Sequence, residues 1–401
     1  MIPAAMSTRN LRLLPIFSAL SFTPVFVPVI VLFWEESGLS TMDIYLLQGL
    51  FALWVVLLEV PTGMVADRMG KRASLLAAQV IIAVGFCGYG FADSFLEFLL
   101  VEVVIALGAS LLSGADSALL FDSLQAVGRE AEFTDQMGRN QGIRMLSFAA
   151  STLLGGFVAM ESLRMTMWLS AVGPAVAAVV VWLMVDVKPV EARRSMRSEI
   201  SAYRDLIRSA SRFVWRHQEV RWLVLFLSVL TGSAGWLLWM YQPYMAHIGL
   251  PVWAFGVAFA VYNLFAAFSS RQADRFEKRL GPGRVLVGLA LLQILPLPLM
   301  ASLIGGFSFL FVLGHQAVRG LARPIISGRI MGFTEDDKRA TVLSMVSMLS
   351  RLFFAITAPL IGFVNGATTL SGALWIQAGL LVGVLVVVGV LRPNFRGDGE
   401  E

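Results

Sequence analysis

Twelve stretches of mostly apolar residues alternate with short charged segments along the chain. They lie near residues 12–33, 44–66, 73–92, 96–122, 142–160, 165–186, 221–247, 251–271, 284–304, 307–330, 340–363 and 370–391. Each is close to the roughly 20 residues that a helix needs to cross the hydrocarbon core of a bilayer. The pattern therefore predicts an all-α polytopic membrane protein with twelve transmembrane helices.

The longest polar interruption separates six of these stretches from the other six. We predict an N-terminal bundle at residues 1–187, a cytoplasmic linker at 188–220, and a C-terminal bundle at 221–401 that ends in a short cytoplasmic tail. Apolar residues recur in the linker at steps of three and four, which is typical of an amphipathic helix on a membrane surface. Its polar positions include the seven arginines Arg193, Arg194, Arg197, Arg204, Arg208, Arg212 and Arg216.

The two halves share a sequence register. Asp67 and Asp274 each lie in a charged loop and are 207 residues apart, and Arg144 and Arg351 show the same offset. One offset at separate places indicates duplication of a six-helix unit. Transporters built from such repeats bind their substrate near the bilayer midplane.

The first of these loops carries a motif that points to a family. Its sequence, Gly63-Met64-Val65-Ala66-Asp67-Arg68-Met69-Gly70-Lys71-Arg72, resembles the loop between helices 2 and 3 of the Major Facilitator Superfamily and departs only at Val65, where the family usually has leucine. The resemblance covers nearly all of residues 11–392. It implies two pseudo-symmetric six-helix bundles that carry a solute by alternating access.

The resemblance also implies that this loop closes the cytoplasmic mouth, together with an acidic residue at the end of helix 4. We expect Arg72 to form a charge-assisted bond with Asp122 there. The alternative is an ordinary cytoplasmic turn rich in positive charge. The predicted gating residues are Gly63, Asp67, Arg68, Gly70, Lys71, Arg72, Asp122, Asp274 and Arg275.

Composition and charge support a membrane protein. Hydrophobic residues make up 57% of the chain and charged residues 14%, with a mean hydropathy of +0.75, which excludes a soluble globular protein. Most of the 31 Lys and Arg residues lie on one side of the bilayer if the N-terminus is cytoplasmic. We therefore expect both termini in the cytoplasm of a bacterial-type inner membrane. The net charge of +4 reflects this bias and indicates no nucleic-acid partner.

Two of the acidic residues of the predicted helix 4 lie away from its ends, where a charge is costly. Glu102 and Asp116 are fourteen residues apart, which places them on one face of a continuous helix. We predict Asp116 as the proton-coupling carboxylate, because desolvation favours its protonated form, with Glu102 as the reserve candidate.

The predicted helix 10 carries basic residues instead. His315, Arg319 and Arg323 recur every four residues and so form one stripe. They could bind an anionic group of the substrate or pair with Asp116 when no substrate is present; the alternative is a set of static ion pairs between helices. In the superfamily, helices 1, 4, 7 and 10 line the central cavity, so the resemblance places this stripe and the acids of helix 4 across the transport path.

Aromatic residues gather at the end of the predicted helix 7. Trp236, Trp239 and Tyr241 could stack on a flat or amphipathic solute. Rings at this depth also serve as anchors in the interfacial belt of membrane proteins. The sequence leaves both interpretations open.

We therefore expect a proton-coupled secondary transporter that exports small amphipathic or anionic organic molecules, similar to the drug:proton antiporter branch. The sequence departs from that branch because no proline precedes Gly155-Gly156 and helix 4 has acids where an arginine is common. Alternatives are a specific transporter, for uptake or export, of an anionic metabolite such as a siderophore or organic acid, and, less favoured, a non-transporting receptor.

No enzyme is indicated. The chain has no Walker loop, no metal-ligand spacing and no nucleophile–base pair, and a single cysteine, Cys87, excludes an intrachain disulfide. We expect no cofactor and no metal. The expected partners are a small-molecule substrate, protons and membrane lipids, and the expected oligomeric state is a monomer.

Overall fold

The structure is a computed structural model that describes residues 4–187, 205, 208–335 and 338–393. Every regular element in these residues is a helix. Most of the predicted linker, including Arg193, Arg194, Arg197 and Arg204, lies outside the described residues.

The first half contains eight α-helices and one short 3₁₀ helix within the described residues. They are α1 (Ala4–Leu20), α2 (Ile30–Glu36), α3 (Thr41–Met69), α4 (Lys71–Tyr89), α5 (Phe95–Leu112), α6 (Ala115–Gln125), η1 (Glu130–Glu132), α7 (Phe133–Val158) and α8 (Leu163–Trp182).

From Gln218 onward, the described residues form eight α-helices and one 3₁₀ helix. They are α10 (Gln218–Leu238), α11 (Tyr241–His247), α12 (Val252–Arg271), α13 (Ala273–Ile294), α14 (Pro296–Ser302), η2 (Ser308–Phe311), α15 (Val312–Phe333), α16 (Arg339–Ala367) and α17 (Leu370–Val390).

These helices follow the twelve predicted stretches, and the expected all-α, twelve-helix fold is confirmed. Four stretches are each divided between two helices, at α1/α2, α5/α6, α10/α11 and α13/α14. Within the described residues, nine helical segments are long and apolar enough to cross a membrane. The stretches that fall short contain α1, α7 and α15, which carry arginines at positions such as Arg12, Arg144 and Arg319.

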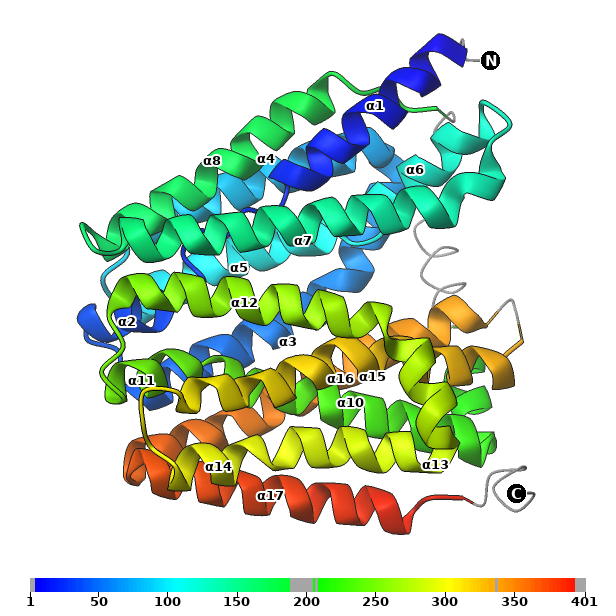
Figure 1. Ribbon diagram of the computed structural model, residues 1–401. Coiled ribbons are helices and arrows are strands. Elements are labelled where there is room, and N and C mark those ends of the chain that lie inside the picture. Colours follow the sequence, from blue (N-terminus) through cyan, green and yellow to red (C-terminus); the bar gives the residue numbers. More distant parts are fainter. Residues whose placement is uncertain (1–3, 188–204, 206–207, 336–337, 394–401) are drawn as a thin grey trace. The chain divides into compact units, whose positions relative to one another are not determined.

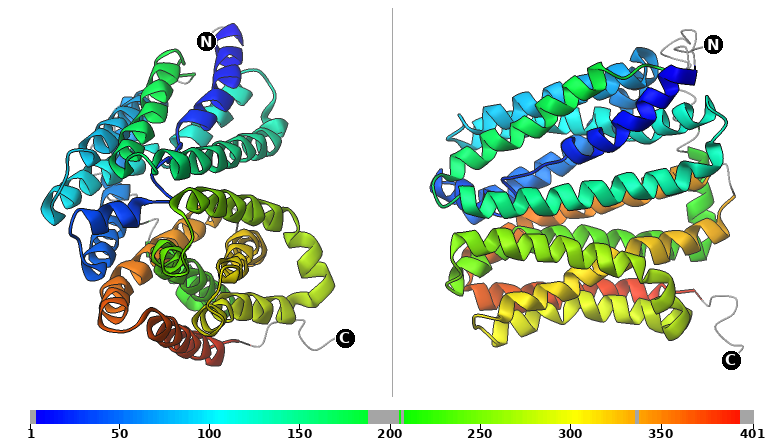
Figure 2. Two further views of the ribbon diagram at one scale, coloured as in Figure 1. Left: turned by 60° about the vertical axis from the view of Figure 1, so that its left-hand side comes forward. Right: turned by 45° about the horizontal axis from the view of Figure 1, so that its top comes forward.

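The chain forms two compact units. One comprises residues 1–39, 50–193 and 251–261, and the other comprises residues 40–49, 194–250 and 262–401. Figures 1 and 2 show that the helices within each unit run side by side. The start of α3 thus belongs to the second unit and the start of α12 to the first, so each unit includes one helical segment from the other half of the sequence.

In the first unit, α4 packs along both α5 and α8 (Figure 1). A core of fully buried side chains, including Leu14, Phe17, Leu75 and Val181, joins α1, α4 and α8 to α6. Glycine permits the close approach of α5 to α4, because a Cβ on Gly108 would lie 2.6 Å from a side-chain carbon of Ile82 and 3.0 Å from the carbonyl oxygen of Ala78. In lipid the hydrophobic effect does not drive helices together, so their association depends on close van der Waals packing, which small residues at the crossing permit.

This packing predicts that Gly108→Ala destabilises the protein by about 1–3 kcal/mol through overpacking, seen as a lower unfolding temperature of the protein in detergent. Gly379→Ala on α17 is the matched control, because open space surrounds that glycine and alanine is the better helix former. A Gly108→Ala protein as stable as the control would show that α4 and α5 move apart at no cost.

Candidate functional site

Asp116 of α6 and Arg144 of α7 form an ion pair within the first unit. Arg144 Nη2 lies 2.8 Å from Asp116 Oδ2, and the Arg144 and Asp116 side chains are 29% and 25% exposed. The other carboxylate oxygen accepts the backbone N–H of Ser117 at 2.7 Å. Arg144 Nε is buried and has no hydrogen-bond partner among the described residues. The pair is therefore accessible to water and retains one unused donor.

The helix that carries the two acids is interrupted between them. Gly114 adopts a left-handed conformation (φ +78°) and separates α5 from α6, which a residue with a Cβ would adopt only at a cost. The expected common face of Glu102 and Asp116 assumed one continuous helix, and that assumption was wrong. Asp116 lies in the first turn of the new helix, where an acid is favoured by the helix dipole.

Glu102 has a different environment. It is 5% exposed and accepts a hydrogen bond from the hydroxyl of Tyr89 at the end of α4. The Tyr89 ring packs against Phe98, with 5.5 Å between centroids, and against Trp34, at 6.4 Å. The two predicted proton-coupling residues thus belong to separate places, one paired and water-accessible and the other buried among aromatic rings.

His315 and Tyr241 come together in the second unit. Their rings stack at 6.3 Å between centroids with an interplanar angle of 16°, and both side chains are almost fully buried. His315 Nε2 lies 3.0 Å from the carbonyl oxygen of Gln293, and Tyr241 also packs edge-on against Tyr262. Helices α11, α12, α13 and α15 all contribute to this cluster.

Arg319 follows His315 one turn later on α15. Its guanidinium donates to Gln316 Oε1 at 3.0 Å and to Asn263 Oδ1 of α12 at 2.5 Å. Both partners are neutral amides, and the predicted transmembrane stretches of this half contain no Asp or Glu. Arg319 and Arg323 are exposed, whereas His315 is buried. The predicted basic stripe thus presents two guanidinium groups whose charge no acid in these stretches neutralises.

The aromatic candidates do not form one cluster. Trp236 is 2% exposed, donates to the hydroxyl of Thr357 at 2.8 Å and stacks on Phe353 of α16. Tyr241 instead contacts α15 through His315, and Trp239 is half-buried. Because Trp236 and Tyr241 are buried in protein, they are not belt anchors exposed to lipid.

An ion pair joins the α3–α4 loop region to Asp122, as predicted, but the basic partner is not the predicted one. Lys71, and not Arg72, pairs with Asp122 at the end of α6. Arg72 donates to the carbonyl oxygens of Val181 and Trp182 at the end of α8, at 3.3 and 2.7 Å. Its backbone N–H donates to Asp186. The expected Arg72–Asp122 pair was wrong because the first residue of α4 faces α6 and the next faces α8.

The glycines of this motif have distinct environments. Gly70 adopts φ +87° directly before α4, whereas Gly63 lies inside α3 with open space around it. Arg68 lies in the last turn of α3, and the side chain of Asp67 lies outside the described residues.

In the second half, the corresponding loop is tied to α15 by a pair of opposite polarity. Arg329 Nε lies 2.7 Å from Glu277 Oε1 of α13, and Arg329 is 207 residues after Asp122. Here the helix supplies the base and the loop region the acid. Asp274 and Arg275 bind neighbours on the same surface, Lys278 at 2.8 Å and Gln272 at 2.9 Å. The half-chain offset of 207 residues pointed to Arg329, but its charge is opposite to that of Asp122, so a repeat read from like charges does not include it.

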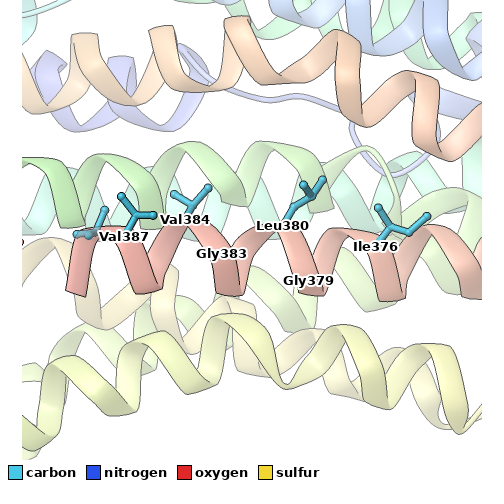
Figure 3. A pocket seen from close by; sticks show the side chains of 7 residues that line it. Ile376, Gly379, Leu380, Gly383, Val384 and Val387 are labelled. Atoms are coloured by element: carbon cyan, nitrogen blue, oxygen red, sulfur yellow. The ribbon is translucent and has the colours of Figure 1, made fainter. Parts of the chain in front are cut away.

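A separate apolar groove runs along α17. Figure 3 shows Ile376, Leu380, Val384 and Val387 lining it, with Gly379 and Gly383 between them. None of its lining residues is titratable, and none of the candidate transport residues belongs to it.

Comparison with known proteins identifies relatives over most of the chain. A family model described as the Major Facilitator Superfamily matches residues 13–315. The uncharacterized MFS-type transporter YxaM of Bacillus subtilis (strain 168) is 19% identical over 93% of both chains. The uncharacterized MFS-type transporter MJ1560 of Methanocaldococcus jannaschii is 18% identical over 66% of this chain and 67% of its own.

Solved structures show the same fold. A point mutant of the nucleoside transporter NupG has a TM-score of 0.79 at 14% identity, and the match covers 96% of this chain and 100% of the NupG chain. A bacterial homologue of the human lysosomal transporter Spinster has a TM-score of 0.73 at 17% identity, over 98% of this chain and 96% of its own. A D-xylose-proton symporter has a TM-score of 0.70 at 12% identity, over 97% of each.

The ion pair at the loop leads to a stability prediction. Asp122→Asn should destabilise the protein by on the order of 2 kcal/mol, less than a fully buried pair, because Lys71 is 36% exposed. The combined change Lys71→Asp and Asp122→Lys should recover most of the lost unfolding temperature.

The matched control is the same charge exchange with Asp122, made at Arg72 and not at Lys71. Arg72→Asp with Asp122→Arg should bring no recovery, because Arg72 bonds the end of α8. Equal recovery of the unfolding temperature in both exchanges would mean that stability depends on the total charge of this region and not on the specific Lys71–Asp122 pair.

Proposed function

Because the chain belongs to the Major Facilitator Superfamily, we propose that it is a proton-coupled secondary transporter that exports small anionic or amphipathic organic molecules by alternating access. Arg319 carries the proposal for an anionic substrate. Its bonded partners are neutral amides, so its positive charge is available to a carboxylate, sulfonate or phosphate of the substrate.

The substrate site extends from Arg319 to the groups beside it. Arg323 adds a second cation one turn along α15, while Gln316 and Asn263 orient the guanidinium and can exchange hydrogen bonds with polar substrate atoms. Tyr241 and His315 form a ring stack next to these polar groups; both are almost fully buried, so a flat apolar part of the substrate meets them only in a conformation that exposes them. Trp236, which stacks on Phe353 of α16, and Trp239 directly after α10 are the remaining aromatic candidates for substrate contact.

Asp116 and Arg144 couple transport to protons. Protonation of Asp116 removes the negative charge of the ion pair and releases a guanidinium that already has one unpartnered buried donor. Loss of the proton restores the pair. Because both side chains are partly exposed, the proton can be exchanged with water. Glu102, held by Tyr89, is the second candidate for this role.

Gating rests on Lys71 and Arg72 at the start of α4, on Asp122 at the end of α6, and on the region around Asp274 and Arg275. The protein acts in a bacterial-type inner membrane with both termini in the cytoplasm, as a monomer and without a cofactor. The second candidate function is transport of one anionic metabolite, in which case uptake is equally compatible. A D-xylose-proton symporter shares this fold, so the fold is compatible with symport of a single metabolite. A non-transporting receptor is the least favoured.

The test of the function is flux in proteoliposomes that contain a pH-sensitive dye, with a panel of drugs, organic acids and siderophores. Proton movement against the solute supports export by antiport, and movement with the solute supports the second candidate. If the folded protein transports none of the solutes and no solute triggers proton flux, both proposals fail.

Replacing Arg319 tests the anion site. Arg319→Gln should weaken binding of an anionic substrate by about 10- to 100-fold, because charge-assisted hydrogen bonds are worth about 1.5–3 kcal/mol, and should weaken binding of a neutral analogue much less. The measurement is substrate-dependent quenching or flux at several substrate concentrations. Equal losses for both ligands would return Arg319 to a purely structural role.

Replacing Asp116 tests coupling. Asp116→Asn resembles the protonated form, so pH-driven net transport should fall at least about tenfold, while exchange of substrate across the membrane at equal pH continues. Glu102→Gln is the matched control and should retain pH-driven transport. Coupling that survives in Asp116→Asn and is lost in Glu102→Gln would move the role to Glu102.

A further inference from the structure

A short helix precedes α10 and presents two different faces. Residues 208–216 are helical. Ala210, Phe213 and Val214 are 0%, 8% and 4% exposed and turn towards the protein. The opposite face is exposed and consists of Arg208, Arg212, Trp215 and Arg216. Trp215 is 65% exposed.

The buried face fixes this helix to the second unit. The Phe213 ring lies 5.3 Å from the ammonium of Lys338 and packs on the ring of His217 at 4.1 Å between centroids. Lys338 pairs with Glu335 in the turn that joins α15 to α16. The exposed face is therefore held in place by contacts on the other side of the helix.

The exposed face has an excess of positive charge. Arg221 of α10 lies over the Trp215 ring at 5.8 Å and donates to its carbonyl oxygen at 3.2 Å. Among the described residues, no ion pair involves Arg208, Arg212 or Arg216. The acidic residues nearest to them in the sequence are Asp205 and Glu219. With Arg221, this segment therefore has four guanidinium groups and only two carboxylates.

The place of this face in the chain decides what it meets. Gln218 begins α10, a helix that is long and apolar enough to cross the membrane, so residues 208–217 lie where that helix leaves the hydrocarbon. Tryptophan is enriched at this level, and arginine binds phosphate oxygens with two parallel donors. We propose that Arg212, Trp215, Arg216 and Arg221, with Arg208, form a binding site for the phosphate headgroup of an anionic phospholipid.

In this site the guanidinium groups of Arg212 and Arg216 bind the phosphate, and Arg221 adds charge from α10. The Trp215 ring lies at the boundary between headgroup and acyl chain. Because Phe213 contacts Lys338, the bound lipid also holds the turn between α15 and α16. This site is independent of the transported substrate.

The test is native mass spectrometry of the full-length protein in detergent, titrated with phosphatidylglycerol and, in parallel, phosphatidylcholine. We expect preferential retention of phosphatidylglycerol. Arg212→Gln with Arg216→Gln should reduce its affinity about 25-fold, from about fivefold for each arginine near an anionic surface. Trp215→Ala should weaken the binding of both lipids, since it removes the apolar contact that they share, together with the ring beneath Arg221.

The matched control removes two other exposed arginines, Arg139→Gln with Arg284→Gln, and should leave phosphatidylglycerol binding unchanged. The inference is overturned if the control weakens binding as much as the double variant, if both lipids bind equally to the unaltered protein, or if soluble glycerophosphate competes as well as the lipid. The unfolding temperature of each variant without lipid establishes that it is folded, and the single changes Arg212→Gln and Arg216→Gln replace the double variant if it is not.

Discussion

The cost of a charge in hydrocarbon governs most of the polar structure of this protein. Even on lenient scales an ionised side chain at the centre of a membrane helix costs about 2.5–3.5 kcal/mol, so each such group needs an ion pair, hydrogen bonds or water. Asp116 and Arg144 use the first solution, Arg319 the second with Asn263 and Gln316, and Glu102 a hydrogen bond from Tyr89. These three environments differ in how readily the charge can change, and this difference gives the residues different proposed roles.

The same constraint applies to the backbone wherever a helix is interrupted. The segment between α1 and α2 contains Pro24 and Pro28, and its freed N–H at Phe26 donates to Ser170 Oγ of α8 at 3.1 Å. Neighbouring helices must approach such a break closely. A Cβ on Gly155 of α7 would overlap the carbonyl oxygen of Val25. The glycine pair of α7 therefore has a packing role. This role does not require the preceding proline that is usual in the drug:proton antiporter branch.

The sequence was sufficient for the fold but not for the pairing of polar side chains. Runs of apolar residues reveal helices because length and hydropathy are local properties, and the offset shared by Asp67 and Asp274 reveals the duplication. Whether Lys71 or Arg72 meets Asp122 depends instead on a rotation of about 100° between consecutive helical residues. Arg144 was visible only as a repeat of Arg351, since nothing local indicates that α7 contacts α6. Gly114, with its positive φ, ends one helix and begins another, so helical periodicity does not predict the relative directions of residues on either side of it.

The two halves show which features of the repeat are constrained. Both tie the loop region after their second helix to the end of their fourth, through Lys71 with Asp122 and through Glu277 with Arg329. The polarity is opposite, and Arg329 also donates to the carbonyl oxygen of Pro282. An ion pair has the same Coulomb energy when its signs are exchanged, so stability alone permits either arrangement. The surroundings distinguish them: the acid of the first half is almost fully buried, whereas in the second half the base is the more buried partner, at 15% exposure against 33% for Glu277. The tie between loop and helix is therefore the feature that the two halves share, and its more buried partner is the acid in the first half and the base in the second.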